Sequence, residues 1–276
     1  MKVLQYYKRD LWLGILKRIY IMLIPVLYLI SEVISTHKVI NSMQDMGIMT
    51  GNGTIMDYFL NATRGMGVYI FDPKDVFFIP IGWFVFEIGI AYFIAYYAVN
   101  DFNDYGKLTL TAGKNRGSFF FSKVLWCITS IILYYALTWI VVAIGALICG
   151  ASSTLKFSTE FTMNVLDYGT YYTSQADIVY ISIILPMFVN ISLCLFEMTM
   201  AFYVSPVVSF ALLSGYYIIG TYYTSPIFIG NFAMWLRSSF ITEQGLSPMS
   251  GVILSLAVLV ASLMVGRNYI KGADIM

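Results

Sequence analysis

Three glutamates stand inside long apolar stretches of the sequence, at Glu32, Glu87 and Glu197, and no lysine or arginine lies within those stretches to pair with them. An acidic side chain at membrane depth costs about 2 to 3 kcal/mol unless it is protonated, hydrogen-bonded or facing a cavity. The three residues are therefore candidates for lining a substrate path, with Glu87, near mid-membrane, the best of them. The competing interpretation is a carboxyl group hydrogen-bonded to a Tyr, Ser or Thr of a neighbouring helix.

The other reactive residue types form no recognisable site. Cys127, Cys149 and Cys194 fall in apolar runs and share no metal-ligand spacing with His37, the single histidine. Gly113-Lys114 lacks the preceding glycine and the following hydroxyl of a phosphate-binding loop. We therefore expect no catalytic, metal or cofactor site on this chain and no enzyme activity of its own. If ATP drives the protein, another chain binds it.

The composition indicates a membrane protein. Of the 276 residues, 59% are hydrophobic and 11% are charged, whereas soluble domains carry about 25% charged residues. The net charge of +1 gives no excess of positive charge for binding nucleic acid. We predict an all-α integral membrane protein that forms a single transmembrane domain over residues 1–276.

A membrane core about 30 Å thick requires roughly 20 apolar helical residues. The fourth and fifth stretches of this kind are nearly continuous, so they must form a tight hairpin that turns around Ser205 and Pro206. Six transmembrane helices are predicted, at 19–36, 76–99, 124–149, 178–200, 202–223 and 249–266.

Basic residues set the orientation of such a chain. Eleven of the sixteen fall on one side of the predicted spans, in the amino-terminal segment, in the loop after the second span and in the carboxy-terminal tail. The remaining five are spread over three longer loops on the other side. Both termini are therefore predicted to be cytoplasmic.

Residues 1–18 read as an amphipathic helix. Leu4, Tyr7, Leu11 and Ile15 recur at helical spacing, with charged residues on the other side. The pattern predicts a helix that lies in the inner membrane interface. A plain basic segment before the first span is the alternative.

The loop at 100–123 is the most informative stretch. Asp104 can cap a short helix through Leu108, Gly113 is a plausible stop, and Asn115 or Ser118 can start the next helix. A stiff helix joined by tight turns to two spans could transmit force from a soluble partner. On physical grounds, docking of a partner and a purely structural loop are equally open.

The outer segment at 224–248 mixes apolar residues with Pro226, Gly230, Gly245 and Pro248. It is too apolar for a solvated loop and too broken for a full span. Backbone can enter a membrane without crossing it only where protein or a wet cavity covers its polar groups. We therefore predict short re-entrant or interfacial outer helices between spans five and six.

This order of parts resembles the membrane subunits of ABC-2 type ATP-binding-cassette transporters over nearly the whole chain. That family has an interfacial amino-terminal helix, a cytoplasmic coupling helix between spans two and three, and re-entrant outer helices between spans five and six. The loop is also similar to the family's local pattern, an acidic residue and a glycine, alternating apolar residues, then arginine, an aromatic run and lysine. The matching positions are Asp104, Tyr105, Gly106, Lys107, Leu108, Leu110, Arg116, Phe119 to Phe121 and Lys123.

The resemblance implies a coupling role for Asp104 to Leu108, Leu110 and Arg116. It implies a dimer, with a second copy or a paralogous permease, bound to ABC ATPase subunits that hold ATP and Mg. The chain also looks similar to bacterial permeases that export phenol-soluble modulins and other amphipathic antimicrobial peptides. An amphipathic peptide or a lipid-like molecule is then the expected substrate, and the bacterial cytoplasmic membrane is the expected location.

Two other classes of function remain open from the sequence. One is a membrane anchor or immunity protein that binds a partner and transports nothing. The other is a secondary transporter that uses Glu87, but such transporters are commonly built from repeated halves, and the sequence contains no convincing repeat.

Overall fold

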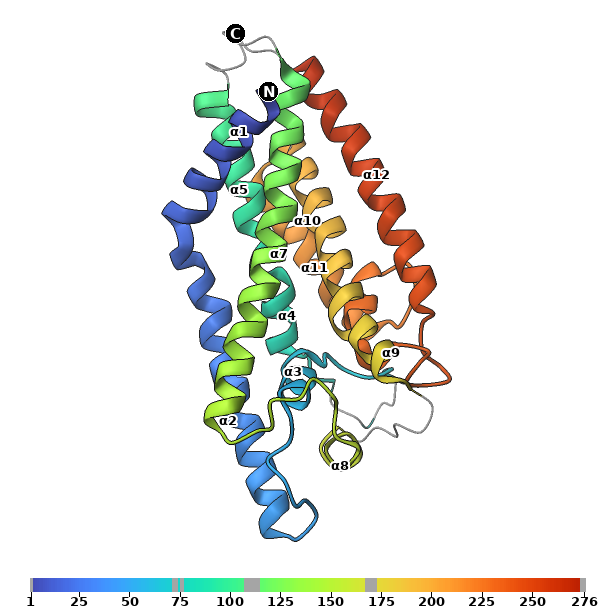
Figure 1. Cartoon of the computed structure of the whole chain (residues 1–276). Coiled ribbons are helices and arrows are strands. Elements are labelled where there is room, and N and C mark those ends of the chain that lie inside the picture. The colour runs from blue at the N-terminus through green and yellow to red at the C-terminus, as the bar shows by residue number, and fades with distance from the viewer. Residues whose placement is uncertain (1, 71–73, 75–76, 107–114, 167–172, 274–276) are drawn as a thin grey trace.

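The computed structural model describes residues 2–70, 74, 77–106, 115–166 and 173–273, which are mostly helical and contain no named strand. The long helices run lengthwise beside one another, and both termini lie at one end of the bundle, here called the termini end (Figure 1). The predicted all-helical class is confirmed. Four helical segments are long and apolar enough to cross a membrane: Ile81–Asp104, Arg116–Ile148, Gln175–Tyr203 and Pro248–Gly272.

The other two predicted spans are helical, but they are not among these four candidate spans. The stretch at 19–36 falls largely within α2 (Leu23–Asp45), which extends beyond the apolar run into polar sequence. The stretch at 202–223 is α11 (Pro206–Tyr222), which is apolar but has only 17 residues. Six crossings therefore remain a prediction.

The amino-terminal segment forms one bent helical rod. Helix α1 (Lys2–Asp10) continues through a π-helical turn, η1 (Leu11–Ile15), and a 3-10 stretch, η2 (Leu16–Met22), into α2. Arg18 leaves helical geometry, with φ −123° and ψ 21°, and marks the bend. Residues 2–17 are thus helical, as predicted, but α1 runs on through η1 and η2 toward α2 and is not a separate helix. Its location in a membrane interface remains a prediction.

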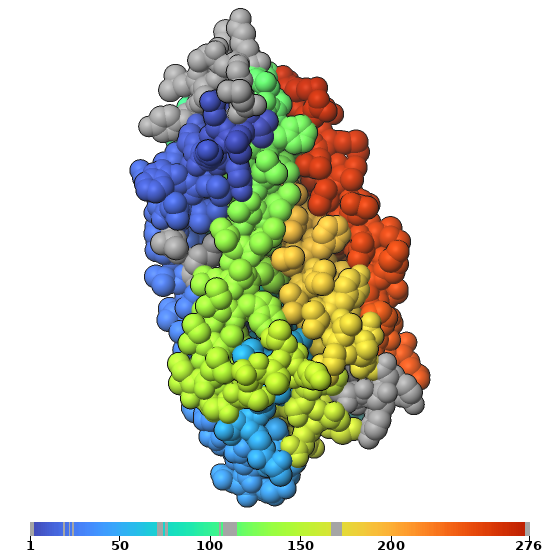
Figure 2. Space-filling view, in the orientation of Figure 1, coloured from blue at the N-terminus to red at the C-terminus, as the bar shows by residue number. Residues whose placement is uncertain are grey.

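This rod packs in parallel along α7 (Arg116–Ile148), as the blue and green surfaces in Figure 2 show for its first half. The Tyr6 ring contacts Phe119, with ring centroids 6.2 Å apart, and Asp10 pairs with Lys123. Further along, two glycines allow the rod and α7 to approach each other closely. The offset in residue number between contacting positions of the rod and α7 changes by at most one residue from the first of these contacts to the last. The glycine contacts are Gly14 against Trp126 and Gly145 against Val33.

The long helix Gln175–Tyr203 is the most buried of the four candidate spans. It consists of α9 (Gln175–Val179), a π-helical turn η4 (Tyr180–Ile184) and α10 (Leu185–Tyr203). Helix α10 packs against α5 (Ala91–Asp101), α7, α11 and α12 (Pro248–Gly272). In contrast, α12 is the least buried candidate span and exposes large apolar side chains, as expected of a helix that faces lipid or another chain.

Two local signals in the sequence are confirmed. The hairpin turns at Ser205, whose Oγ accepts a hydrogen bond from the Val208 amide, and Pro206 occupies the first turn of α11. At the start of α7, Asn115 Oδ1 accepts a hydrogen bond from the Ser118 amide at 3.1 Å. Both are caps of the kind that supply acceptors to unpaired amides at a helix start.

At the opposite end, the segment at 224–248 folds around a buried arginine. It forms two short 3-10 helices, η5 (Ile229–Ala233) and η6 (Trp235–Arg237), where we predicted short re-entrant or interfacial helices, and their position in a membrane remains a prediction. Arg237 is fully buried, and its guanidinium donates to the Asn231 side chain and to three backbone carbonyls. Two of these carbonyls lie in the last turn of α11, where a helix leaves carbonyls without amide donors, and the third lies in irregular backbone. The three carbonyls belong to Gly67, Gly220 and Thr221.

Two short helices complete this end, α3 (Ile55–Thr63) and α8 (Thr159–Asn164). Asp57 joins them. Its Oδ2 accepts from the Thr54 amide at 2.9 Å, which closes a capping box at the start of α3, and its Oδ1 accepts from the Ser158 amide at 2.8 Å. Because Ser158 is the cap of α8, one carboxylate holds the starts of both helices.

We expect Gly14→Ala to loosen the amino-terminal rod. A Cβ at this position would lie 2.5 to 2.9 Å from the indole ring of Trp126, which is fully buried. Overpacking of this kind destabilises by about 1 to 3 kcal/mol. The midpoint of thermal unfolding in detergent measures it.

The matched control is Gly215→Ala in α11, where nothing lies within 4 Å of the added Cβ. That change should be neutral or slightly stabilising, since alanine favours a helix by about 1 kcal/mol over glycine. Equal midpoints for the two variants would contradict the close contact between η1 and α7.

We expect Asp57 to make the stability depend on pH. Burial raises the pKa of this carboxyl from 3.8 to about 6, against the opposing effect of its hydrogen bonds. The folded state therefore holds the proton more tightly than the unfolded state. Stability on the order of 3 kcal/mol that is present below pH 4 is lost as the pH rises through 6.

Unfolding followed from pH 4 to pH 7 tests this, with Asp57→Asn as the comparison. The variant cannot titrate at this position, so its stability should fall less steeply over that range. The prediction fails if both proteins show the same slope.

Candidate functional site

The structure separates the three glutamates that the sequence singled out. Glu32 is half-buried on α2 and lines a small polar recess with Tyr28, Asn61 and Arg64. Glu87 is buried on α4 (Ile81–Ile88), and Glu197 is buried on α10. They do not form one site, and their surroundings differ in kind.

Glu87 lies beside a break in the candidate span Ile81–Asp104, between the end of α4 at Ile88 and the start of α5 at Ala91. A break of this kind leaves carbonyls of the last helical turn without amide donors. Tyr134 donates to the carbonyl of Phe86 at 2.7 Å, and Asn190 donates to the carbonyl of Glu87 at 3.0 Å. Side chains from α7 and α10 therefore stabilise the break.

The same groups also bind the carboxylate of Glu87. Asn190 Nδ2 donates to Glu87 Oε2 at 3.0 Å, and Tyr135 Oη lies 3.4 Å from both carboxylate oxygens. This arrangement matches the structural alternative, a carboxyl hydrogen-bonded to a tyrosine of a neighbouring helix. Asn190 was missed in the sequence, because nothing local links it to a residue more than a hundred positions earlier.

Glu197 has different surroundings, because neither of its carboxylate oxygens accepts a hydrogen bond from any described residue, although both are buried. Its side chain lines a cavity of about 340 Å³ between α10, α11 and α12. Of the ten residues around the cavity, Glu197 is the only charged one. The others are Leu193, Phe196, Met200, Ser209, Leu212, Leu213, Tyr216, Ile229 and Val258.

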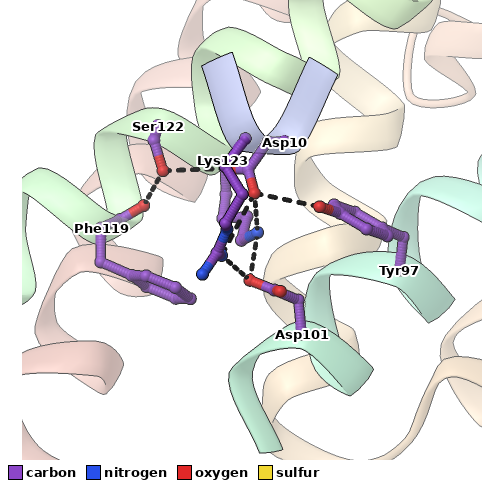
Figure 3. A network of polar contacts seen from close by, with 7 residues as sticks. Asp10, Tyr97, Asp101, Phe119, Ser122 and Lys123 are labelled. Carbon is purple, nitrogen blue, oxygen red and sulfur yellow. Dashed lines mark hydrogen bonds and ion pairs between the residues drawn. The ribbon is translucent and has the colours of Figure 1, made fainter. Parts of the chain in front are cut away.

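The densest group of charges lies near the termini end, where α1, α5 and α7 meet (Figure 3). Lys123 Nζ lies 2.7 Å from Asp10 Oδ1 and 2.5 Å from Asp101 Oδ2. Arg9 Nη2 lies 2.5 Å from the same oxygen of Asp101 and 3.3 Å from Asp10 Oδ1. We call these four residues the charge clamp.

Neighbouring side chains complete the clamp. Tyr97 donates to Asp10 Oδ1 at 3.0 Å and Ser122 donates to Asp10 Oδ2 at 3.1 Å. The ammonium group of Lys123 also lies 4.6 Å from the centre of the Tyr97 ring. Lys123 and Asp10 are fully buried, and the two positive charges balance the two negative ones. A buried group of charges is tolerated when it is paired and hydrogen-bonded in this way.

Sequence reasoning missed the clamp. It placed Arg9 and Asp10 on the polar side of an interfacial helix, and Asp101 and Lys123 in the loop at 100–123. The sequence did contain one signal. Asp101 and Lys123 stand near the two ends of the loop at 100–123, and these ends must lie close together if the loop joins two helices of a hairpin. The partner from α1 lies 113 residues from Lys123, and no local pattern indicates it.

The residues predicted to couple to an ATPase are only partly described. Asp104 is exposed in a π-helical turn, η3 (Phe102–Gly106), which also contains Tyr105, while Gly106 is buried against the Phe119 ring. Lys107, Leu108 and Leu110 lie outside the described residues.

Arg116, the last predicted coupling residue, is described and is occupied within the chain. Its guanidinium donates to the carbonyls of Lys271 and Ala273, at 2.5 and 2.9 Å. Basic side chains favour carbonyl groups at the end of a helix. Arg116 therefore ties the start of α7 to the end of α12.

Among the described residues, no group of three His, Cys, Asp or Glu side chains is placed to hold a metal ion. Comparison with protein-family models, with curated proteins and with solved structures gives no match to this chain.

We expect Lys123→Met to be strongly destabilising, because it leaves Asp10 and Asp101 buried with only Arg9 to balance them. Removing one member of a buried pair costs about 3 to 5 kcal/mol. Adding Asp101→Asn restores charge balance and should recover part of the loss.

Unfolding midpoints of the single and double variants measure the coupling, with Lys38→Met as a control at an exposed position of α2. The control should stay within about 0.5 kcal/mol of the wild type. A double variant no more stable than Lys123→Met would contradict the clamp as a balanced unit.

Proposed function

We propose that this chain is the membrane-spanning subunit of an ATP-driven ABC exporter. In this proposal α2, the broken pair α4 and α5, α7, the segment α9 to α10, α11 and α12 are the six crossings. Two such subunits, identical or paralogous, form the pathway. Separate ATPase subunits bind ATP and Mg and supply the energy, and the cargo is an amphipathic peptide or a lipid-like molecule.

The charge clamp is the observation that carries this proposal. The loop that would receive the ATPase leaves α5 just after Asp101 and enters α7 at Arg116, about two turns before Lys123. The clamp joins these two helices to each other and to α1. A push on the loop would therefore move three helices together rather than bend one of them.

Contacts beside the clamp extend this rigid region to α12. Arg116 holds the carboxy-terminal end of α12 through two carbonyls. The Tyr269 ring of α12 stacks on Phe202 of α10, with centroids 5.8 Å apart. Movement at the loop would thus reach α10 and α12, two of the three helices that border the cavity at Glu197.

The charge distribution supports an orientation with the termini end in the cytoplasm. This end carries the amino-terminal segment, both flanks of the loop at 100–123 and the end of α12, which together hold most of the basic residues. Cytoplasmic segments of membrane proteins carry an excess of lysine and arginine. The proposed location is the bacterial cytoplasmic membrane.

The proposal predicts that a stoichiometric ATPase of the ATP-binding-cassette type stays bound when the chain is purified mildly from its native membrane. Leu108→Asp or Leu110→Asp should abolish this co-purification, because a charge would replace an apolar docking residue. Mass spectrometry of the purified complex measures the ratio of the two chains.

Leu155→Asp is the matched control, since Leu155 is exposed in the segment between α7 and α8, which lies at the end of the bundle opposite the termini end (Figure 1). It should retain the ATPase. An intact chain that carries no ATPase would contradict the exporter and favour the anchor or immunity protein. Retention of the ATPase by both loop variants would contradict the docking position alone.

A further inference from the structure

We propose that the cavity between α10, α11 and α12 binds a molecule whose hydrocarbon chain ends in a primary ammonium group, and that the carboxylate of Glu197 receives this group. The proposal deepens the function given above, because it names the chemical class of the cargo, and its transport role rests on that function. The binding itself does not depend on an ATPase.

The unpartnered carboxylate is the first observation. Glu197 is 1% exposed, and neither oxygen has a hydrogen-bond partner among the described residues. Glu87 is buried to a similar extent, at 2%, and both of its oxygens are within hydrogen-bond reach of Asn190 or Tyr135. The fold therefore supplies partners to one buried carboxylate and leaves the other open on the cavity.

The form of the cavity is the second observation. Glu197 and Leu193 are almost completely buried and form its inner side. Phe196 and Leu212 are 41% and 55% exposed, so the cavity opens between the apolar outer surfaces of α10 and α11. Its volume of about 340 Å³ lies in the range of sites for small ligands, which is about 300 to 1,000 Å³.

The other polar groups of the lining are already occupied. Ser209 Oγ donates to the carbonyl of Pro206, and Tyr216 Oη donates to the carbonyl of Ile227 while it accepts from the Ile229 amide. The carboxylate of Glu197 is therefore the polar group that remains available to a ligand. The apolar walls suit a hydrocarbon chain.

A primary ammonium group fits this arrangement in charge and in hydrogen bonding. It carries one positive charge and three donors, whereas an ionised carboxylate has two acceptor oxygens and no donor. The ten lining residues include no lysine or arginine, so none of these described residues supplies a cation there. A ligand whose hydrocarbon chain ends in an anionic group would be repelled by the carboxylate of Glu197. A ligand that ends in a neutral group would leave this carboxylate without a counter-charge.

Native mass spectrometry of the full chain in detergent tests the proposal with three ligands of equal chain length: dodecylammonium, dodecanol and dodecanoate. We expect one dodecylammonium per chain, bound at least about tenfold more tightly than dodecanol, since a hydrogen bond to a charged group is worth a factor of about ten or more. Dodecanoate should bind most weakly.

Three variants separate the contributions. Glu197→Gln should bind dodecylammonium and dodecanol equally, because the amide keeps the shape and removes the charge. Leu212→Trp should bind neither, because the larger side chain fills the opening. Glu87→Gln, which neutralises a carboxyl group outside the cavity lining, should retain the preference.

The proposal is overturned if the wild-type chain shows no preference for the ammonium ligand, or if Glu197→Gln retains that preference. Failure of the exporter gives a different pattern, since no ATPase would copurify while the preference persisted. If an ATPase copurifies but the preference is absent, the exporter stands and the ligand assignment falls.

Discussion

Polar groups inside this bundle must find their partners within the protein, because helices this apolar leave little water around them. Several features of the structure follow from that requirement. Arg237 donates to carbonyls at the end of α11, Asp57 holds the starts of two short helices, and the break after Ile88 is covered by tyrosine and asparagine side chains. The buried carboxylate of Glu197 departs from the pattern, as do the Trp126 indole nitrogen and the Tyr217 hydroxyl, but of these three only Glu197 lines the cavity between α10, α11 and α12.

The charge clamp meets the same requirement with full charges. Two acids and two bases from three helices neutralise one another, and a tyrosine and a serine fill the remaining acceptor sites of Asp10. Such a group has few alternative arrangements, because separating any pair would leave a charge buried alone. It therefore fixes the relative positions of α1, α5 and α7 more firmly than apolar contact, which lacks direction. A rigid joint beside the loop at 100–123 is what a force-transmitting role requires.

Close packing along the rod has a related consequence. The amino-terminal rod approaches α7 closely at two places, at Gly14 of the rod and at Gly145 of α7. The bend at Arg18 lies between these two contacts. The helices thus touch firmly near the clamp and again toward the opposite end. Movement of α7 would carry the rod with it, whereas α12, with most of its apolar surface exposed, is the helix most open to lipid or to a second chain.

The sequence by itself determined what depends on near neighbours along the chain. The apolar stretches predicted helices, Ser205 and Pro206 predicted the hairpin, and Asn115 predicted the start of α7, because helix length and capping are local properties. Only the tertiary structure decided which polar groups meet. Asp10 and Lys123, Asn190 and Glu87, and Arg116 and Ala273 are each separated by more than a hundred residues, so their pairing depends on how whole helices pack. For the same reason, three glutamates that look alike in the sequence have three different surroundings in the fold.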